Sequence, residues 1–300
     1  MLTSSVFCVS DVTNATKLNF PSQEFLLPKM PEIPDWYFDG IPDMPWLYAL
    51  IGSSLVGLTG IVPLVLSQTF NIQLNEADEF SRSKLNSLLG FAVGALLGDV
   101  FLHSLPEIYG SGNSTAKGQM ASGIYVLLGL ITFIIIEKVL GMVEKDGKTM
   151  AAYLNLIANA IDNFAHGLSL GGAFLTSTRI GITTTIAVLG HEIPHEFADF
   201  GVLLKGGFSW RNAAVMQLST AAFGILGSFS ALLFSGAANT IEARTSWILP
   251  FSAGSFLHIA LVTILPDLIK ESSPRESCKQ MFSILTGIFL VHILDGIIAH

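Results

Sequence analysis

Residues 191–199, His-Glu-Ile-Pro-His-Glu-Phe-Ala-Asp, lie inside an apolar stretch that is long enough to cross a membrane. Charged groups at bilayer depth cost roughly 2.5–3.5 kcal/mol each on insertion scales, and they usually mark an ion pathway. The helical period puts both histidines and the aspartate on one face, with the two glutamates beside them. A helix face that carries imidazoles and carboxylates is typical of a divalent-metal site. The ionisable residues of this stretch are His191, Glu192, His195, Glu196 and Asp199.

A second polar cluster, Asp162-Asn163-Phe164-Ala165-His166-Gly167, comes earlier in another apolar stretch. Asp162 and His166 are four residues apart, so they face together on a helix, with Asn163 one position round. A mixed set of imidazole and carboxylate ligands suits Zn²⁺ or Fe²⁺ better than Ca²⁺ or Mg²⁺, which prefer oxygen ligands. We therefore predict a metal site where the two helices meet. Its candidate ligands are Asp162, Asn163, His166, His191, Glu192, His195 and Glu196.

The composition is that of a polytopic membrane protein. Of the 300 residues, 51% are hydrophobic and only 13% are charged, whereas a soluble domain carries about 25% charged residues. The net charge of −8 and the lack of a basic face argue against a nucleic-acid partner.

Apolar runs long enough for membrane spans of about 20 residues predict an all-α protein of eight transmembrane helices. This number places both termini on the same side of the bilayer. We expect two parts, an N-terminal tail over 1–45 and a transmembrane domain over 46–300. The predicted spans cover residues 46–68, 85–108, 119–141, 151–176, 180–204, 212–235, 246–269 and 281–299.

The distribution of lysine and arginine predicts the orientation of these spans, because cytosolic loops are enriched in both. One set of loops holds ten such residues, and the opposite side holds five. The richer side should be cytosolic, so both termini should be lumenal or extracellular. Two glycosylation sequons, at Asn14 and Asn113, fall on that same lumenal side. The two cysteines, Cys8 and Cys278, would lie on opposite sides, so we expect no disulfide between them. The ten residues are Arg82, Lys84, Lys138, Lys145, Lys148, Lys205, Arg211, Lys270, Arg275 and Lys279.

Two further features concern the helices themselves. Pro194 has no N–H to donate to the carbonyl of Gly190, so we expect a kinked or broken helix that exposes this carbonyl near the ligands. Glycines recur at four-residue spacing over 90–98 and 167–171, which predicts close helix packing.

The motif His191-Glu192-Ile193-Pro194-His195-Glu196 resembles the HExPHE signature of the ZIP family of divalent-metal transporters. The earlier cluster is similar to the family's HNxxDG or HNxxEG motif with two exchanges. Asp162 stands where the family usually has histidine, and His166 stands where it usually has an acid. This variant is most similar to the intracellular branch called ZIP thirteen. The resemblance covers the chain from the segment around His103 to the segment around Asp267.

The resemblance implies eight helices, a homodimer in a lipid bilayer, an elevator-like movement, and a binuclear metal site between the fourth and fifth spans. One metal ion would contact Asp162, His166 and His195. The other would contact Asn163, His166, Glu192, His195 and Gln217, with His191 at its rim. Ligands on the way into or out of this site would come from Asp99, His103, Asp199 and His258, although packing is the favoured role for His258.

The resemblance also implies a cargo and a location. Zinc is the leading cargo, and Fe²⁺ is the alternative because the exchange of Asp162 and His166 changes which ion meets more carboxylate. The branch implies the membrane of the Golgi apparatus, the endoplasmic reticulum or cytoplasmic vesicles.

Two other classes of protein remain open from the residues alone. His191-Glu192-x-x-His195 also matches the HExxH motif of zinc metalloproteases, in which the glutamate is the general base, and Asp295 could supply a third ligand. Pro194 between the histidines and the second polar cluster argue against an enzyme. A sensor would bind metal without moving it, and a measurement of flux separates these classes.

Overall fold

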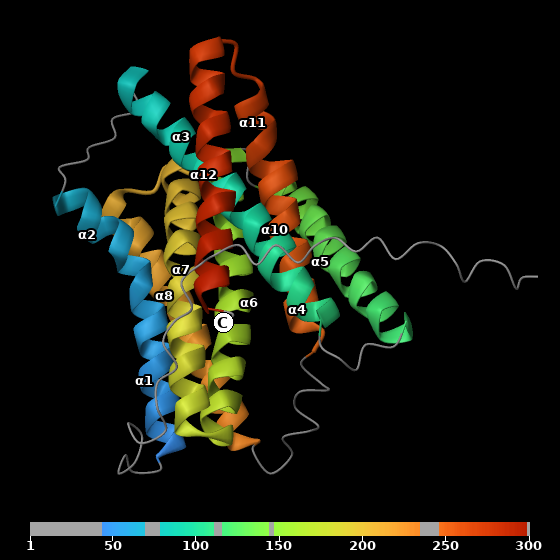
Figure 1. Ribbon diagram of the computed structural model, residues 1–300. Helices are drawn as coiled ribbons and strands as arrows, with labels where there is room; N and C mark the ends of the chain where they lie inside the picture. The colour runs from blue at the N-terminus through green and yellow to red at the C-terminus, as the bar shows by residue number, and fades with distance from the viewer. Residues whose placement is uncertain (1–43, 70–78, 111–115, 144–146, 235–245, 299–300) are drawn as a thin grey trace, which may run out of the picture.

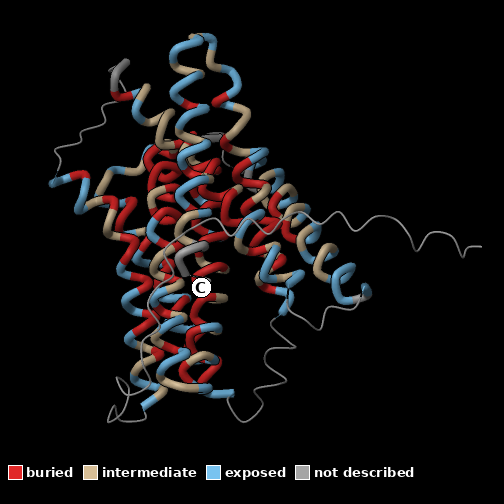
Figure 2. The backbone as a smooth tube through the Cα atoms, viewed as in Figure 1, coloured by how far each residue is buried: buried red, intermediate tan, exposed pale blue. Residues whose placement is uncertain are grey.

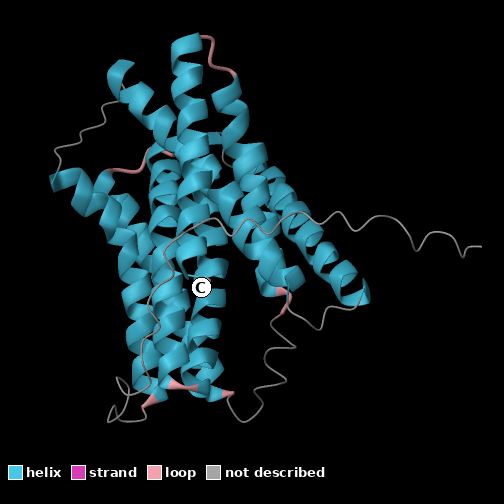
Figure 3. Ribbon diagram, in the orientation of Figure 1, coloured by secondary structure: helices cyan, strands magenta, loops and turns pink. Residues whose placement is uncertain are grey.

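The computed structural model describes residues 44–69, 79–110, 116–143, 147–234 and 246–298, and these consist of helices and short connections (Figure 3). Nearly all of the predicted N-terminal tail lies outside the described residues, as do Cys8 and the sequon residues Asn14 and Asn113. Cys278 is free and exposed. The tail, the glycosylation and the side on which the termini lie therefore stay predictions.

Each predicted span falls on one helix or on a run of consecutive helical segments. The first run is α1 (Pro45–Leu58), η2 (Thr59–Ile61) and α2 (Val62–Thr69), and the second is α3 (Glu79–Gly98), η3 (Asp99–Ser104) and α4 (Leu105–Gly110). Four single helices follow: α5 (Ala116–Val143), α6 (Gly147–Thr176), α7 (Thr178–Lys205) and α8 (Trp210–Leu233). The chain continues with α10 (Ile248–His258), η5 (Ile259–Ile264), α11 (Leu265–Ile269) and α12 (Pro274–Ile298).

Within the described part of the chain, six stretches are long and apolar enough to cross a membrane. The helices α6 and α7 are not among them, although they have 30 and 28 residues. These are the two helices that carry the polar clusters, and polar side chains lower the mean hydropathy of a helix. Composition therefore identifies six spans, and crossing by α6 and α7 stays a prediction. The six stretches are Pro45–Thr69, Ser81–Gly110, Gly118–Val139, Trp210–Leu233, Ile248–Ile269 and Pro274–Leu294.

The helices form two groups that meet along α7 (Figure 1). In the first bundle, α6 packs along α7 and α8, and α1 covers α8. In the second bundle, α3 packs along α12, and α5 packs along α10. Contacts of α7 with α3 and α12, and of α6 with α10, join the bundles. Figure 2 shows the buried residues gathered where the bundles meet. The outer helices α5 and α12 carry exposed apolar side chains such as Leu127, Ile135, Phe282 and Phe289, as lipid-facing helices do.

The predicted glycine contacts are confirmed. Gly90, Gly94 and Gly98 of α3 lie against α12, and Gly167 and Gly171 of α6 lie against α8. A Cβ atom at Gly94 would collide with the backbone of Ile284, and one at Gly167 would collide with the backbone of Gly224. Small residues thus let these helix pairs approach closely.

The predicted break at Pro194 is not found, whereas a kink at this residue stays a prediction. Helix α7 continues without interruption from Thr178 to Lys205 and holds Pro194 in its interior. The π-helical turns are instead η3 and η5, and each is followed directly by a Leu-Pro pair that contains Pro106 or Pro266. A proline cannot donate to the carbonyl four residues before it, and a wider turn accommodates the missing bond. The turn η3 matters for the site because it carries Asp99 and His103.

Candidate metal centre

A tight connection turns α6 back into α7 and brings the two polar clusters face to face. Ser177 alone separates the helices, with an extended backbone at φ −166° and ψ 154°. Its hydroxyl accepts a hydrogen bond from the backbone N–H of Ile180 at 3.1 Å, which caps α7. The two helices therefore run antiparallel, and positions near residue 166 meet positions near residue 191.

The first cluster of donors, which we call the inner group, consists of His166, His191 and Glu192. The Nε2 atoms of the two histidines lie 3.2 Å apart. A glutamate oxygen, Oε2, lies 3.6 Å from Nε2 of His166 and 3.8 Å from Nε2 of His191. One ligand atom from each residue lies close enough to the others for a single metal ion to bind all three. All three residues are nearly or fully buried.

Asp162 supports the inner group from the next turn of α6. One carboxylate oxygen, Oδ2, lies 3.0 Å from Nε2 of His166. The other, Oδ1, accepts a hydrogen bond from the hydroxyl of Ser252 at 3.1 Å. Because Ser252 belongs to α10, the carboxylate links the first bundle to the second at the level of the metal ligands.

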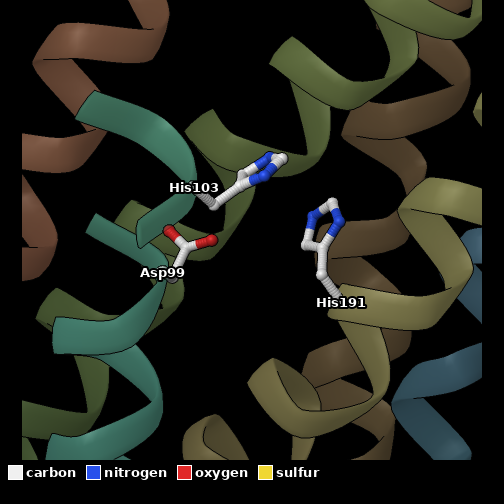
Figure 4. Close-up of side chains that lie close together, drawn as sticks. All are labelled: Asp99, His103 and His191. Carbon is white, nitrogen blue, oxygen red and sulfur yellow. The ribbon is translucent and has the colours of Figure 1, made fainter. Parts of the chain in front are cut away.

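The outer group consists of Asp99, His103 and His191, and it spans the two bundles (Figure 4). Asp99 and His103 come from η3, and both side chains face His191 across the space between the helices. The rings of His103 and His191 have centroids 4.8 Å apart. Asp99 accepts a hydrogen bond from Ser104 at 3.3 Å. The side chain of His103 is 29% exposed, so the outer group lies nearer to the surface than the buried inner group.

His195 lies one helical turn beyond His191 on α7. Its Nδ1 atom is 3.6 Å from Oδ2 of Asp199, and its ring packs edge-on against Phe256 with centroids 4.6 Å apart. Neither ring nitrogen has a hydrogen-bond partner among the described residues. His195 is therefore buried near the inner group without joining its three donors in this structure, and its Nε2 atom, on the side of the ring away from the Asp199 contact, is available to a ligand.

The remaining predicted ligands pair with one another or with other polar residues. The amide of Gln217 on α8 donates to the carboxylate of Glu196 and, at 2.8 Å, to the backbone carbonyl of the same residue. Gly60 lies beside this pair, since a Cβ there would come within 3.5 Å of the Glu196 carboxylate. The amide of Asn163 donates to the side chain and, at 3.1 Å, to the backbone carbonyl of Asn159.

His258 lies apart from both donor groups. It is fully buried, and its Nε2 atom is 2.8 Å from Oε2 of Glu137 on α5. Its ring lies 6.3 Å from that of Phe133, also on α5. These contacts join α10 to α5 within the second bundle, which agrees with the packing role favoured for His258.

Sequence reasoning missed several residues that contact the predicted ligands. Asn159 donates to Asp199, Ser252 donates to Asp162, and Phe256 covers His195. One signal was present for the first of them, because Asn155, Asn159 and Asn163 recur at four-residue spacing and so share a helix face. Ser252 and Phe256 carry no comparable pattern.

The arrangement is suited to binding a divalent cation. Buried carboxylates and imidazoles are costly unless they are paired or coordinate a metal. Oε2 of Glu192 and Oε1 of Gln217 have no hydrogen-bond partner within the described ranges. Imidazole nitrogens combined with carboxylate oxygens favour Zn²⁺ or Fe²⁺ over harder ions.

Comparison with known proteins gives one family. The family model described as ZIP Zinc transporter matches residues 43–150 and 144–295. The chain is 39% identical to the Zinc transporter ZIP13 homolog of Drosophila melanogaster, over 90% of this chain and 94% of the relative. It is 42% identical to Zinc transporter ZIP13 of Pongo abelii, over 82% of this chain and 77% of the relative. The corresponding human protein is 37% identical over 82% and 80% of the two chains.

Proposed function

Because the chain belongs to the ZIP family of zinc transporters, we propose that it carries Zn²⁺ between the lumen of a secretory-pathway compartment and the cytosol. Membership of the family makes the protein a divalent-metal transporter and not an enzyme. The metal ion is its cargo. The lumenal compartment, the Golgi apparatus, endoplasmic reticulum or a cytoplasmic vesicle, is inferred from the similarity to proteins named ZIP13.

One observation carries the proposal most directly. His191 on α7 belongs to both donor groups, so the inner and outer groups form one continuous file of ligands. The file begins at the partly exposed His103 and reaches the buried Glu192. A metal ion could pass from one group to the next without losing all of its protein ligands, and moderate affinity at each step would permit release.

We place the binuclear site between α6 and α7, as the resemblance implies. The first ion would contact Asp162, His166 and His195, and the second would add Asn163, Glu192 and Gln217. Support comes from the distances that join His166 to Asp162 and to Glu192. The ring nitrogens of His195, which lack hydrogen-bond partners among the described residues, could complete the coordination of either ion.

The division into two bundles supports an elevator-like mechanism. The metal ligands of α6 and α7 belong to the first bundle, whereas Asp99 and His103 belong to the second. Sliding of the first bundle against the second would carry His191 away from η3 together with the inner group. The proposal requires that α6 and α7 also cross the membrane, which gives eight spans with both termini lumenal. The homodimer is carried over from the resemblance.

Fe²⁺ is the second candidate cargo, because the family's histidine and acid are exchanged here at Asp162 and His166. A metalloprotease is not favoured, since the family consists of transporters and Pro194 lies between the two histidines of the HExxH pattern. The side chain of Asp295, the third protease ligand considered, lies outside the described part of the structure.

The test is metal flux into proteoliposomes that contain the purified full chain, with Zn²⁺ and Fe²⁺ assayed separately. The variant His195→Ala should abolish saturable flux while the protein still folds. His292→Ala removes an exposed histidine on α12 and should transport normally. If neither metal showed saturable flux while metal still bound at equilibrium, the protein would be a metal sensor and not a transporter. Normal flux in His195→Ala would refute the assignment of His195 as a ligand and would leave the transport function standing.

A further inference from the structure

Three asparagines form a file along the buried face of α6. Asn155, Asn159 and Asn163 recur at four-residue spacing, and their exposed fractions are 0%, 1% and 1%. Residues at this spacing lie one above the other on a helix face. Asn163 belongs to the predicted metal site, so the file leads from that site toward the end of α6 at which the helix begins.

Hydrogen bonds connect most of this file to α7. The amide of Asn163 donates to Asn159, and the amide of Asn159 donates to Oδ2 of Asp199. Asp199 is itself 3.6 Å from Nδ1 of His195. The residues therefore form a continuous polar chain from the candidate metal ligands to Asp199, one turn of α7 beyond His195.

Asp199, at the end of this polar chain, and Asn155, at the end of the asparagine file, have side-chain polar atoms without partners in the described part of the protein. Oδ1 of Asp199 and both amide atoms of Asn155 lack a hydrogen-bond partner among the described residues. Both side chains are fully buried, and an unpaired buried polar group costs about 1–3 kcal/mol. A bound ion or a bound water molecule is a common reason for buried polar atoms to lack a partner within the protein.

The unpartnered atoms lie on the path between the inner group and one end of α7. Asn159 meets Asp199, and His166 meets Glu192, so the antiparallel register puts Asn155 near the level of Leu203. The unpartnered oxygens thus lie between the inner group and the end of α7 at Lys205. Under the orientation proposed above, this is the cytosolic end.

We propose that Asn155, Asn159 and Asp199 form a further station for the divalent cation, between the inner group and the cytosol. This inference rests on the proposed transport function. The station offers amide and carboxylate oxygens with a single charge, whereas the inner group offers two imidazoles and a carboxylate. Zn²⁺ and Fe²⁺ bind imidazole well, so an oxygen-donor station binds them more weakly. A weaker station placed after the tighter one favours release.

The first experiment separates this role from packing. Asn155→Leu replaces an unpaired amide by an apolar group of similar size, which should leave stability unchanged or raise it. We expect zinc affinity at the inner group to stay within about twofold, and flux into proteoliposomes to fall about tenfold, the scale on which supporting groups act at metal sites. Asn155→Asp retains an oxygen donor and should transport. The matched control is Gln280→Leu, since Gln280 is a buried amide on α12 with an unpartnered Nε2 atom.

Wild-type flux in Asn155→Leu would overturn the station, and so would a loss of zinc affinity as large as the loss of flux. The latter result would make Asn155 a support of the inner group. A wild-type protein that neither binds nor transports metal would instead refute the proposed function itself.

A second experiment locates the metal ion directly and does not depend on transport. Asn155→Cys is prepared in the Cys8→Ser, Cys278→Ser background and treated with a small membrane-permeant thiol reagent. Zn²⁺ should slow modification at position 155, and it should not slow modification of Ala158→Cys, which replaces a fully buried residue of the apolar core. Equal rates with and without Zn²⁺ at position 155 would overturn the proposal.

Discussion

Nε2 of His166 and Nε2 of His191 lie 3.2 Å apart across the interface between α6 and α7. Of two neutral imidazoles at this distance, one must donate and the other accept. Both atoms also lie within 4 Å of the same oxygen of Glu192. A single metal ion between the three atoms would replace one hydrogen bond by three ligand bonds. Because His191 also faces His103, this ring is the point at which the two donor groups meet.

The variant His191→Ala should therefore remove a ligand from both groups at once. We expect equilibrium zinc binding to weaken by at least about tenfold and saturable flux to fall to the background of empty vesicles. Isothermal titration of the purified protein and flux in proteoliposomes measure the two effects. Unchanged zinc affinity in this variant would show that the ion does not bind where the two histidines meet.

His103→Ala removes a ligand from the outer group only. The zinc concentration for half-maximal flux should rise, because the first ligands met by the ion are weakened, while the maximal rate should change little. Flux measured over a full series of zinc concentrations, with all other conditions kept the same, separates the half-maximal concentration from the maximal rate. A fall in the maximal rate at an unchanged half-maximal concentration would place His103 in a later step.

Flux should decrease as the compartment that supplies the metal is acidified from pH 7.5 to pH 5.5. Protons compete with metal for imidazole nitrogens, and histidine ordinarily has a pKa of about 6.5. Lower pH therefore favours the protonated rings, which cannot bind the ion, and the half-maximal zinc concentration should rise. Equal acidification of both compartments controls for a proton gradient. A rate that is independent of pH over this range would exclude histidine as the ligand that limits loading.

Much of the fold could be predicted from the sequence because its determinants are local in the chain. Apolar runs of about span length defined the helical stretches, and glycines at four-residue spacing identified the faces on which α3 and α6 pack. The ligand motifs were readable because i, i+4 spacing fixes a helix face whatever the tertiary structure is. The meeting of α6 with α7 followed from their adjacency in the chain.

The grouping of the ligands depends on contacts between distant segments and could not be predicted in the same way. His103 is 88 residues before His191, and the rings meet only because α3, which continues into η3, packs against α7. Ser252 and Phe256 reach the site from α10, and no local pattern marks them. The break expected at Pro194 is not found because this proline lies inside the continuous helix α7, and the π-helical turns that precede Pro106 and Pro266 were not predicted.

Two glycines of α6 offer a matched test of packing. A Cβ at Gly167 would collide with the backbone of Gly224 and Ser228, whereas a Cβ at Gly172 meets nothing within 4 Å. Gly167→Ala should therefore force α6 and α8 apart and destabilise the protein by about 1–3 kcal/mol. Gly172→Ala should be neutral or stabilising, because alanine favours a helix over glycine. Thermal unfolding in detergent compares the two, and similar midpoints would mean that the α6–α8 contact is adaptable.

The final prediction concerns the ion pair between Lys205 and Asp267, whose Nζ and Oδ2 atoms lie 2.6 Å apart. Lys205 ends α7 in the first bundle, and Asp267 lies on α11 beside the second, so an elevator-like movement must break this pair. Asp267 also pairs with Lys270 at 3.1 Å, but that contact stays within one segment and would survive the movement. The pair is partly exposed, so it should stabilise the observed arrangement by no more than about 1 kcal/mol.

Lys205→Asp should consequently change the flux rate by up to about fivefold, since 1 kcal/mol corresponds to that factor at room temperature. The double variant Lys205→Asp with Asp267→Lys restores opposite charges and should recover the original rate. Lys270→Ala, which removes the other partner of Asp267, should transport as the wild type does. Failure of the double variant to recover the rate would show that the effect of Lys205→Asp does not act through the pair with Asp267. An unchanged rate in Lys205→Asp itself would contradict the elevator-like mechanism in the form proposed here, because that movement separates α7 from α11 and must break the pair.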